Sequence, residues 1–357
     1  MAVEPRSDPI AVDDARAGGE DDRARAATIF DVARLAGVSH QTVSRVINEH
    51  PNVRAATRER VQQAIQQLRY RPYTAARALV TRRSRTIGLI TMGGQDWGPS
   101  LTAMHFNEAA REARYAVSMV SLLSTDEAAL RDSVERLLRQ SVEAVVLVAE
   151  DRNALQLLQR IELGVPLIAL DPSDSAGTLT VALDQYAGAR GAVRHLVELG
   201  HRSILHLAGP RVSPAAAERE RGWRDELAKH GLVAREPGVG DWSPSSGALF
   251  GRQLDLSVPF TAVFSSNDQM AVGLMHVLVE RGLSVPADVS VVGFDDIPEA
   301  EYLMPPLTTV RQDFERLGRD MMARVAAVLS EVPEIPPARA VPELIVRAST
   351  APPPSKS

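Results

Sequence analysis

From Thr86 onward, short runs of β-branched and aliphatic residues alternate with longer amphipathic stretches. In a first series the expected strands are TIGLIT, AVSMVSL, EAVVLVA and PLIALD, with helices near 102–114, 126–139 and 152–162. In a second series they are SILHLAG, TAVFSS and VSVVGFDD, with helices near 186–199, 215–230 and 268–281. Such repeated strand-helix alternation implies right-handed crossovers around parallel sheets. The two series therefore predict two α/β lobes.

The segment of residues 28–85 has a charge opposite to that of the whole chain. It holds eleven arginines against three acidic residues, a difference of +8, whereas the 357-residue chain carries −5. A small basic segment on a neutral or acidic body is typical of a nucleic-acid-binding head.

Two short helical patterns open this basic segment. The first ends at Gly37, which can adopt the left-handed conformation that closes a helix, and its apolar residues are Ile29, Val32, Ala33 and Ala36. Ser39 can cap a second helix, whose inward residues are Val43, Val46 and Ile47. Two short helices joined by so tight a turn predict a helix-turn-helix, the second helix of which enters the DNA major groove.

The composition limits where and how the chain can act. Its length suggests two or three domains, and the absence of cysteine excludes disulfides and thiolate metal sites. Residues 1–27 mix seven acids with four arginines and have no apolar run, so we expect a disordered acidic tail rather than a secretory signal. The sequence contains no run of about 18 apolar residues, which is the length that a membrane-spanning helix would need. The absence of cysteine fits a reducing cytoplasm, so a cytoplasmic protein is expected.

Motifs of common enzyme families are missing from the sequence. There is no GxxxxGK[ST], GxSxG or HExxH, and GVGDW at 238–242 lacks the downstream glycine of a dinucleotide-binding fingerprint. The eight histidines are scattered without metal-ligand spacing. We therefore expect no catalytic residues, no metal and no cofactor.

A specific pattern of residues runs through the head and beyond it. The pattern comprises Asp31–Ala33, Ala36–Ser39, Gln41–Val46 and Asn48, then Thr57–Val61, Leu68, Tyr70, Pro72, Ala76 and Leu79. It resembles the DNA-binding head of the LacI/GalR family of transcriptional regulators. One departure is Arg54, where the family more often has a serine able to cap the third helix.

This resemblance implies roles for individual side chains of the head. The principal base readers would be His40 and Gln41, with Arg45 also reaching base edges, since glutamine suits adenine and arginine suits guanine. Residues that would bind phosphate oxygens, and so position the head without reading sequence, are Ser39, Thr42, Ser44 and Asn48. A hinge helix would follow, with Leu79 as an apolar wedge in the minor groove.

The body resembles the two-lobed core of the same family, which is related to periplasmic sugar-binding proteins. Matching pieces include His201-Arg202, Leu207–Pro210, Gly222-Trp223, Asn267–Gln269 and Pro305–Thr309. The expected domains are the tail (1–27), a helix-turn-helix (28–72), a hinge helix and linker (73–85), the core (86–350) and a disordered tail (351–357). Within the core, the N-lobe would span about 86–183 and 312–341, and the C-lobe about 184–311 and 342–350.

Ligands of open parallel sheets bind beyond the carboxyl ends of the strands. The polar residues at such positions include Asp171, Asn267 and Asp295. By the resemblance, these three and Arg219 would hydrogen-bond ligand hydroxyls, while Trp242 and Phe314 would pack on a sugar ring.

Other residues near these strand ends receive a different interpretation. Asp268 and Asp296 are expected to be structural, because an aspartate after a strand often caps a helix. Trp223 is expected in the core, and the loop of residues 91–99 is expected to edge the cleft.

The combined expectation is a repressor of carbohydrate-utilisation genes that binds a pseudo-palindromic operator as a dimer and is released by a small sugar. The C-terminal segment lacks a leucine heptad, which favours a dimer over a tetramer. Two alternatives remain open: a regulator of the same family responding to a purine or other metabolite, and a sugar-binding protein without DNA function.

Overall fold

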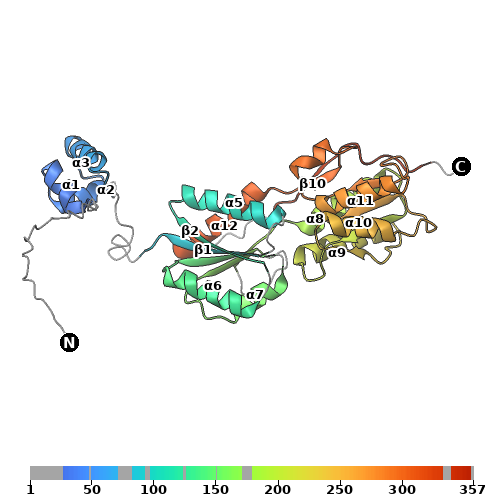
Figure 1. The fold of residues 1–357 in the computed structure, drawn as a ribbon, viewed down its shortest axis with the longest axis horizontal. Helices are drawn as coiled ribbons and strands as arrows, with labels where there is room; N and C mark the ends of the chain where they lie inside the picture. The colour runs from blue at the N-terminus through green and yellow to red at the C-terminus, as the bar shows by residue number, and fades with distance from the viewer. Residues whose placement is uncertain are drawn as a thin grey trace, which may run out of the picture. The chain divides into compact units, whose positions relative to one another are not determined.

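The computed structural model describes residues 27–47, 50–70, 83–92, 97–123, 126–149, 151–170, 179–332 and 339–354. The chain divides into two compact units, Met1–Arg82 and Arg83–Ser357 (Figure 1). Several predicted features lie outside the described residues: the acidic tail up to residue 26, Asn48, most of the hinge with Leu79, Asp171, and residues 355–357.

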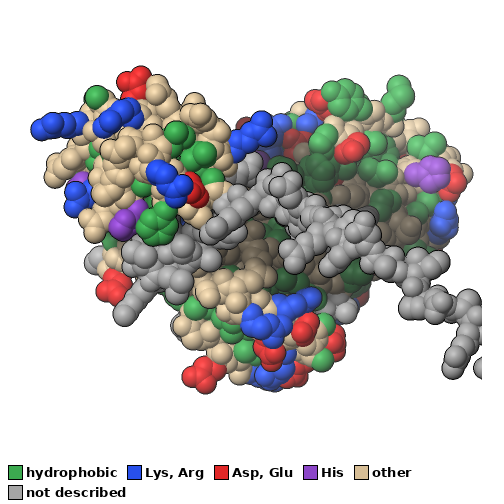
Figure 2. All heavy atoms as spheres, turned by 60° about the vertical axis from the view of Figure 1, so that its left-hand side comes forward, with side chains coloured by type: hydrophobic (Ala, Val, Ile, Leu, Met, Phe, Trp, Pro, Cys, Tyr) green, Lys and Arg blue, Asp and Glu red, His purple; other side chains and the backbone are tan. Residues whose placement is uncertain are grey.

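The described part of the first unit folds into three helices: α1 (Ile29–Ala36), α2 (His40–Ile47) and α3 (Ala55–Gln67). Their shared core contains Val32, Val43, Val46, Val61 and Ala64. The predicted helix-turn-helix is confirmed, and arginine side chains stand on its surface (blue in Figure 2).

Local hydrogen bonds define the helix ends of the head. Thr28 and Asp31 form a capping box at the start of α1, which ends at Gly37 with φ 64°. The Oγ of Ser39 accepts a hydrogen bond from the Thr42 backbone N–H at 3.2 Å, as a cap of α2 does. Arg54 occupies the capping position of α3 without a side-chain hydrogen bond, as predicted.

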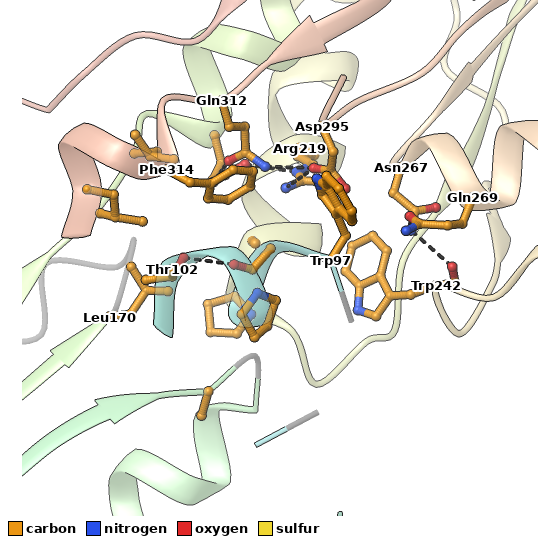
Figure 3. Close-up of a pocket in the computed structure, with 18 of the residues that line it drawn as sticks. Trp97, Thr102, Leu170, Arg219, Trp242, Asn267, Gln269, Asp295, Gln312 and Phe314 are labelled. Atoms are coloured by element: carbon orange, nitrogen blue, oxygen red, sulfur yellow. Dashed lines mark hydrogen bonds and ion pairs between the residues drawn. The ribbon is translucent and has the colours of Figure 1, made fainter. Parts of the chain in front are cut away.

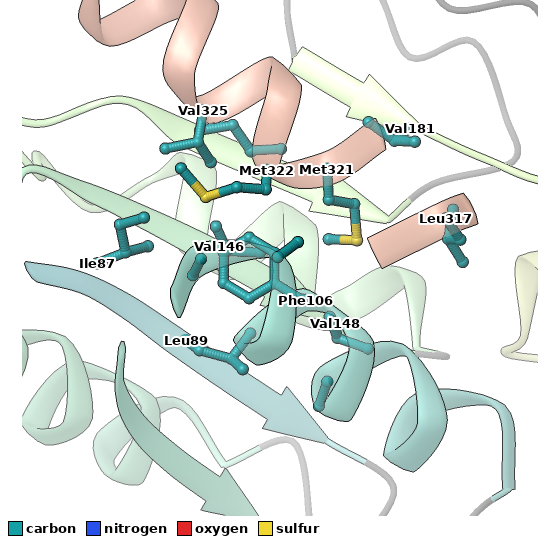
Figure 4. Packing of buried hydrophobic residues seen from close by; sticks show 14 of the residues in the cluster. Ile87, Leu89, Phe106, Val146, Val148, Val181, Leu317, Met321, Met322 and Val325 are labelled. Atoms are coloured by element: carbon teal, nitrogen blue, oxygen red, sulfur yellow. The ribbon is translucent and has the colours of Figure 1, made fainter. Parts of the chain in front are cut away.

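The N-lobe is built on a parallel five-stranded sheet with the order β2-β1-β3-β4-β5. The strands are β1 (Thr86–Met92), β2 (Ala116–Leu122), β3 (Ala144–Val148), β4 (Leu167–Leu170) and β5 (Leu179–Val181). Helices α5 (Trp97–Glu112) and α12 (Phe314–Leu329) cover one face, and α6 (Glu127–Arg139) and α7 (Arg152–Gln159) cover the other. Figure 4 shows Phe106 packed between the sheet and α12.

The C-lobe is built on a parallel four-stranded sheet with the order β7-β6-β8-β9. The strands are β6 (Ile204–Ala208), β7 (Gly238–Val239), β8 (Ala262–Ser265) and β9 (Ser290–Val292). Helices α8 (Gln185–Glu198) and α9 (Pro214–Lys229) cover one face, and α10 (Pro244–Gln253) and α11 (Asp268–Glu280) cover the other. The predicted fold class of two α/β lobes with parallel sheets is thus confirmed.

Three crossings of the chain join the two lobes. The first runs from β5 into α8, and the second runs from β10 (Thr309–Arg311) into α12. The third leads from α12 to β11 (Glu343–Ile345), which pairs antiparallel with β10. A short 3₁₀ helix (Pro298–Tyr302) follows β9. The crossings place residues from both lobes around the space between the two sheets.

The structure corrects some expected element boundaries. Helix α5 begins at Trp97, within the segment predicted as loop 91–99. The elements absent from the prediction include α10, α12, β5, β7, β10 and β11. Residues 351–354 of the predicted C-terminal tail are among the described residues, and Ala351 exchanges hydrogen bonds with Ser290. At the other end of the core, the carbonyl of Arg85 in the predicted linker accepts a hydrogen bond from the β2 backbone.

No described helix is both long and apolar enough to cross a bilayer.

Candidate functional site: an interlobe cavity and a basic helical surface

A cavity of about 300 Å³ lies between the lobes. This is the lower end of the range of about 300–1,000 Å³ that small-molecule sites occupy. The N-lobe lines it with mostly apolar side chains, including Trp97, Leu170, Phe314 and Leu317, and the C-lobe with mostly polar ones, including Gln185, Arg219, Asn267, Gln269 and Asp295 (Figure 3).

Five of the six residues predicted to bind an effector line this one cavity. They are Arg219, Trp242, Asn267, Asp295 and Phe314. The sixth, Asp171, lies outside the described residues. Whether the five touch a ligand stays a prediction, but their convergence agrees with the rule that parallel sheets bind ligands beyond their strand ends.

Arg219 is the buried centre of the polar wall. It comes from α9 and is 4% exposed. Its Nε donates to Gln185 Oε1 at 2.9 Å, and its Nη1 donates to the carbonyl of Ser266. Its guanidinium carbon lies 3.9 Å from the centroid of the Phe294 ring. Hydrogen bonds and stacking thus hold this cation in one orientation before any ligand arrives.

Asp295 faces Arg219 across the wall. The Arg219 Nη2 lies 3.5 Å from Asp295 Oδ1, which also accepts a hydrogen bond of 2.6 Å from Gln312 Nε2. Gln312 in turn accepts a hydrogen bond of 2.7 Å from Gln185. Since Gln312 belongs to the second crossing and Gln185 to the start of α8, this ring of four polar side chains ties the cavity to two of the crossings.

Trp242 is held over a glycine at the edge of the cavity. Its backbone is in the left-handed region, with φ 72°, and its carbonyl accepts a 3.0 Å hydrogen bond from Asn267 Nδ2. Asn267 also caps α11 by accepting from the Met270 N–H. A Cβ at Gly209 would lie 2.2 Å from Cη2 of Trp242, so only glycine leaves room for the ring.

Asp268 has a structural role, as predicted, but not as a helix cap. Its two carboxylate oxygens accept hydrogen bonds from the Thr309 hydroxyl at 2.6 Å and from the Ile297 N–H at 2.9 Å. Burial, and next the charge of Asp295, raise the pKa of Asp268 well above its ordinary value. The residue joins the start of α11 to the chain that enters the second crossing.

Asp296 and Trp223 also have the predicted structural environments. The carboxylate of Asp296 pairs with Arg311 and Arg347, each at 2.6 Å. Trp223 is fully buried in the core of the C-lobe. Neither of these residues lines the cavity.

Several cavity residues escaped the sequence reasoning: Trp97, Thr102, Gln185, Gln269 and Gln312. Gln269 stands within the matching piece Asn267–Gln269, and Gln312 stands two residues before Phe314, so these neighbours were the available signal. Trp97 and Thr102 belong to the first turns of α5, which the sequence predicted as a loop or a helix start.

The cavity suits an uncharged ring that carries hydroxyls. Amide, guanidinium and carboxylate groups can donate to and accept from several hydroxyls at once, while Trp242 and Phe314 offer aromatic faces to the apolar side of the ring. No group of three or more histidine, aspartate or glutamate side chains suited to a metal ion occurs among the described residues.

On the head, α2 presents the predicted base-reading side chains to solvent. His40, Gln41 and Arg45 are all exposed, and the His40 ring lies 5.2 Å from that of Phe30. Ser39 and Thr42, predicted to bind phosphate, already share a 3.0 Å hydrogen bond between their hydroxyls. Ser44 is partly exposed.

Comparison with known families agrees with both units. Residues 28–73 match the model of bacterial regulatory proteins of the lacI family, and residues 193–350 match a periplasmic binding protein-like domain. The lactose operon repressor of Escherichia coli K12 is 37% identical over 303 residues, which cover 84% of this chain and 83% of that protein. The regulator CelR of Thermobifida fusca is 36% identical and covers 84% of this chain and 91% of its own.

Solved structures give the same result. A lac repressor dimer bound to operator and the anti-inducer ONPF has a TM-score of 0.83 at 33% identity, covering 92% of this chain and 100% of that one. A CelR–cellobiose complex has a TM-score of 0.67 at 32% identity, covering 90% and 99%. By sequence and by fold, the chain belongs to the lacI family of bacterial regulatory proteins.

Proposed function

We propose that this regulator is a repressor of carbohydrate-utilisation genes, which binds a pseudo-palindromic operator as a dimer and is released from it by a small sugar. The single observation that supports a sugar most is the cavity, which combines a polar wall centred on Arg219 and Asp295 with the aromatic faces of Trp242 and Phe314. The named partners of its relatives agree, since one is a lactose operon repressor and another is solved with cellobiose.

The head would bind DNA through α2. The exposed His40, Gln41 and Arg45 are chemically suited to base edges in the major groove, where glutamine pairs with adenine and arginine with guanine. Ser39, Thr42 and Ser44 would contact phosphate oxygens beside them. Two heads in a dimer would read two half-sites about one helical turn apart.

Release requires that the sugar bind one arrangement of the lobes more tightly than another. The ring formed by Gln185, Arg219, Asp295 and Gln312 offers a route, because it contacts the cavity and includes residues of two crossings. A tenfold loss of operator affinity requires only about 1.4 kcal/mol of coupling. We further propose that the protein acts in the cytoplasm and has no catalytic activity, as its relatives are regulators.

The experiment starts with selection of an operator from random duplexes at physiological salt. Binding to the selected duplex is then measured with methyl β-D-galactopyranoside, methyl β-D-glucopyranoside, cellobiose, adenine and hypoxanthine. We expect at least one glycoside to weaken binding tenfold or more. A response confined to a purine would replace the sugar assignment, and a response to none of the probes would contradict it.

A further inference from the structure

Among the described apolar residues of the cavity wall, Trp97 is the one that packs against the hydrophobic cores of both lobes. It is the first residue of α5, in the N-lobe, and it lines the cavity (Figure 3). Its side chain packs against the N-lobe core, which includes Phe106 and Phe314, and also against the C-lobe core, which includes Trp242 and Ile297. A change in the lobe arrangement therefore has to move the Trp97 ring over one of its two contacts.

The indole N–H of Trp97 has no hydrogen-bond partner among the described residues, although the Nε1 atom is fully buried. An indole nitrogen is a donor only, and a buried donor that has left water without gaining an acceptor is unfavourable. Oxygen acceptors of the facing lobe, Asp295 among them, line the same cavity as Trp97 (Figure 3). The unpaired N–H thus disfavours this arrangement relative to one in which a shift of the lobes, or a ligand oxygen, supplies an acceptor.

We propose that Trp97 couples the bound effector to the arrangement of the lobes, an inference that rests on the proposed function. Its ring contacts the effector from the N-lobe and slides on the C-lobe core, and its N–H is unpaired in the arrangement described and paired in the alternative one. A ligand can shift such an equilibrium only through interactions that differ between the two states. Trp97 supplies that difference, so it is a positioning residue of the switch.

Trp223 is a matched control within the same chain. Its indole Nε1 is also buried without a hydrogen-bond partner in the described structure. However, Trp223 is fully buried and packs within a single C-lobe cluster, where its ring stacks on His206 at 5.1 Å. Because its surroundings move as one body, its unpaired N–H is the same in any lobe arrangement and favours none.

The first test compares Trp97→Phe with Trp223→Phe, since each substitution keeps an aromatic ring and removes the N–H. In Trp97→Phe the unpaired N–H is absent, so the arrangement of the lobes described here becomes more populated. Two affinities should then change in opposite directions: that of the ligand-free protein for the selected operator, and that of the DNA-free protein for its best glycoside. The glycoside affinity should change by about tenfold. Trp223→Phe should change neither, although it can lower the urea midpoint. Equal weakening of both affinities in Trp97→Phe, or no change in either, would overturn the proposal.

A second measurement does not depend on DNA or on ligand. The chain has three tryptophans, so ¹⁵N-labelled indoles give three resonances, and the two Phe variants assign two of them. In the ligand-free wild type, the Trp97 indole should show exchange between two environments and the Trp223 indole only one. A single static environment for Trp97 would contradict the proposal. If no operator is found, the proposed function fails, but this spectrum still decides the role of Trp97.

Discussion

The polar wall of the cavity is a set of residues that hold one another in place. Sequence reasoning identified Arg219, Asn267 and Asp295, because strand ends and a family resemblance mark them. It did not find Gln185 or Trp97, because their roles arise from tertiary contacts. Gln185 is the first residue of α8, after the first crossing, and its side-chain amide donates to Gln312, which is 127 positions away along the chain. No local pattern encodes such a pairing.

Arg219→Lys should separate ligand binding from DNA binding. Lysine keeps the charge beside Asp295 but cannot reproduce the hydrogen bonds to Gln185 and Ser266. We expect glycoside affinity, measured by calorimetry, to fall tenfold or more, because the loss of a charge-assisted hydrogen bond costs about 1.5–3 kcal/mol. Operator affinity without ligand should change less than glycoside affinity. The control is Arg224→Lys on the same helix, because the Arg224 side chain is 41% exposed. Unaltered glycoside affinity in the Arg219 variant would show that Arg219 is not part of the ligand site.

Gly209→Ala should displace Trp242 from the cavity edge. The new Cβ would lie 2.2 Å from the indole ring, so the ring must move, and glycoside affinity should fall about tenfold. Gly191→Ala in α8 is the control, because nothing lies within 4 Å of its Cβ. That variant should bind glycoside normally and be about 0.5–1 kcal/mol more stable. Normal binding by Gly209→Ala would show that Trp242 makes no ligand contact.

Among the elements, α10 shows why part of the fold was not visible in the sequence. Glycines at 247 and 251 lower helix propensity, so the stretch resembles a loop. In the structure they permit close packing of α10 on α11, since a Cβ at Gly247 would lie 2.0 Å from the carbonyl oxygen of Met270. The Ser243-Pro244 pair that caps the helix was the available signal. Likewise, the segment 91–99 that was predicted as a loop includes Pro99, yet proline is tolerated in the first turn of α5.

Arg54→Ser should stabilise α3 by supplying the missing cap. The side chain at this position forms no capping hydrogen bond, and a serine there is worth about 1 kcal/mol. In the full chain, hydrogen exchange of the first α3 amides should slow about fivefold. Arg54→Ala is the matched control, because it removes the same charge without adding a cap. Equal exchange in the two variants would argue against the capping explanation.

The contact between α8 and α9 depends on a buried carboxylate. Glu226 has no exposed surface and accepts hydrogen bonds from Arg190 at 2.7 Å and Arg194 at 3.1 Å. Burial alone would raise the pKa of Glu226, but the hydrogen bonds and charges of the two arginines outweigh it and lower the pKa to about 2. The ionised form is therefore favoured by folding, which stabilises the protein above the ordinary pKa of 4.5.

Glu226→Gln should reveal this contribution as a pH-dependent loss of stability. At pH 7 we expect the free energy of unfolding, from urea titrations, to fall by about 2 kcal/mol, since the charge-assisted bonds are lost. As the pH decreases from 4.5 toward 2, the wild-type carboxylate becomes protonated and the difference between the two proteins should shrink. A difference that stays constant between pH 7 and pH 3 would contradict the assignment.

At the scale of the whole molecule, the sequence predicted the organisation better than the details. Charge reversal marked the head, and strand-helix alternation marked the two parallel sheets, because both signals are repeated over many residues. The lobe interface is different. It depends on single side chains such as Trp97, and on segments such as α12, which packs on the N-lobe although it follows the C-lobe strands in the sequence. Periodicity along the chain cannot report contacts of that kind.

The most direct test of the account is the affinity of the purified protein for a selected operator duplex at physiological salt, with random duplex as competitor and with or without the glycosides named above. We predict a preference of about a thousandfold or more for the operator, and at least a tenfold loss of that affinity when an effective glycoside is added. Equal affinity for operator and random duplex, in the presence and absence of every glycoside, would contradict it.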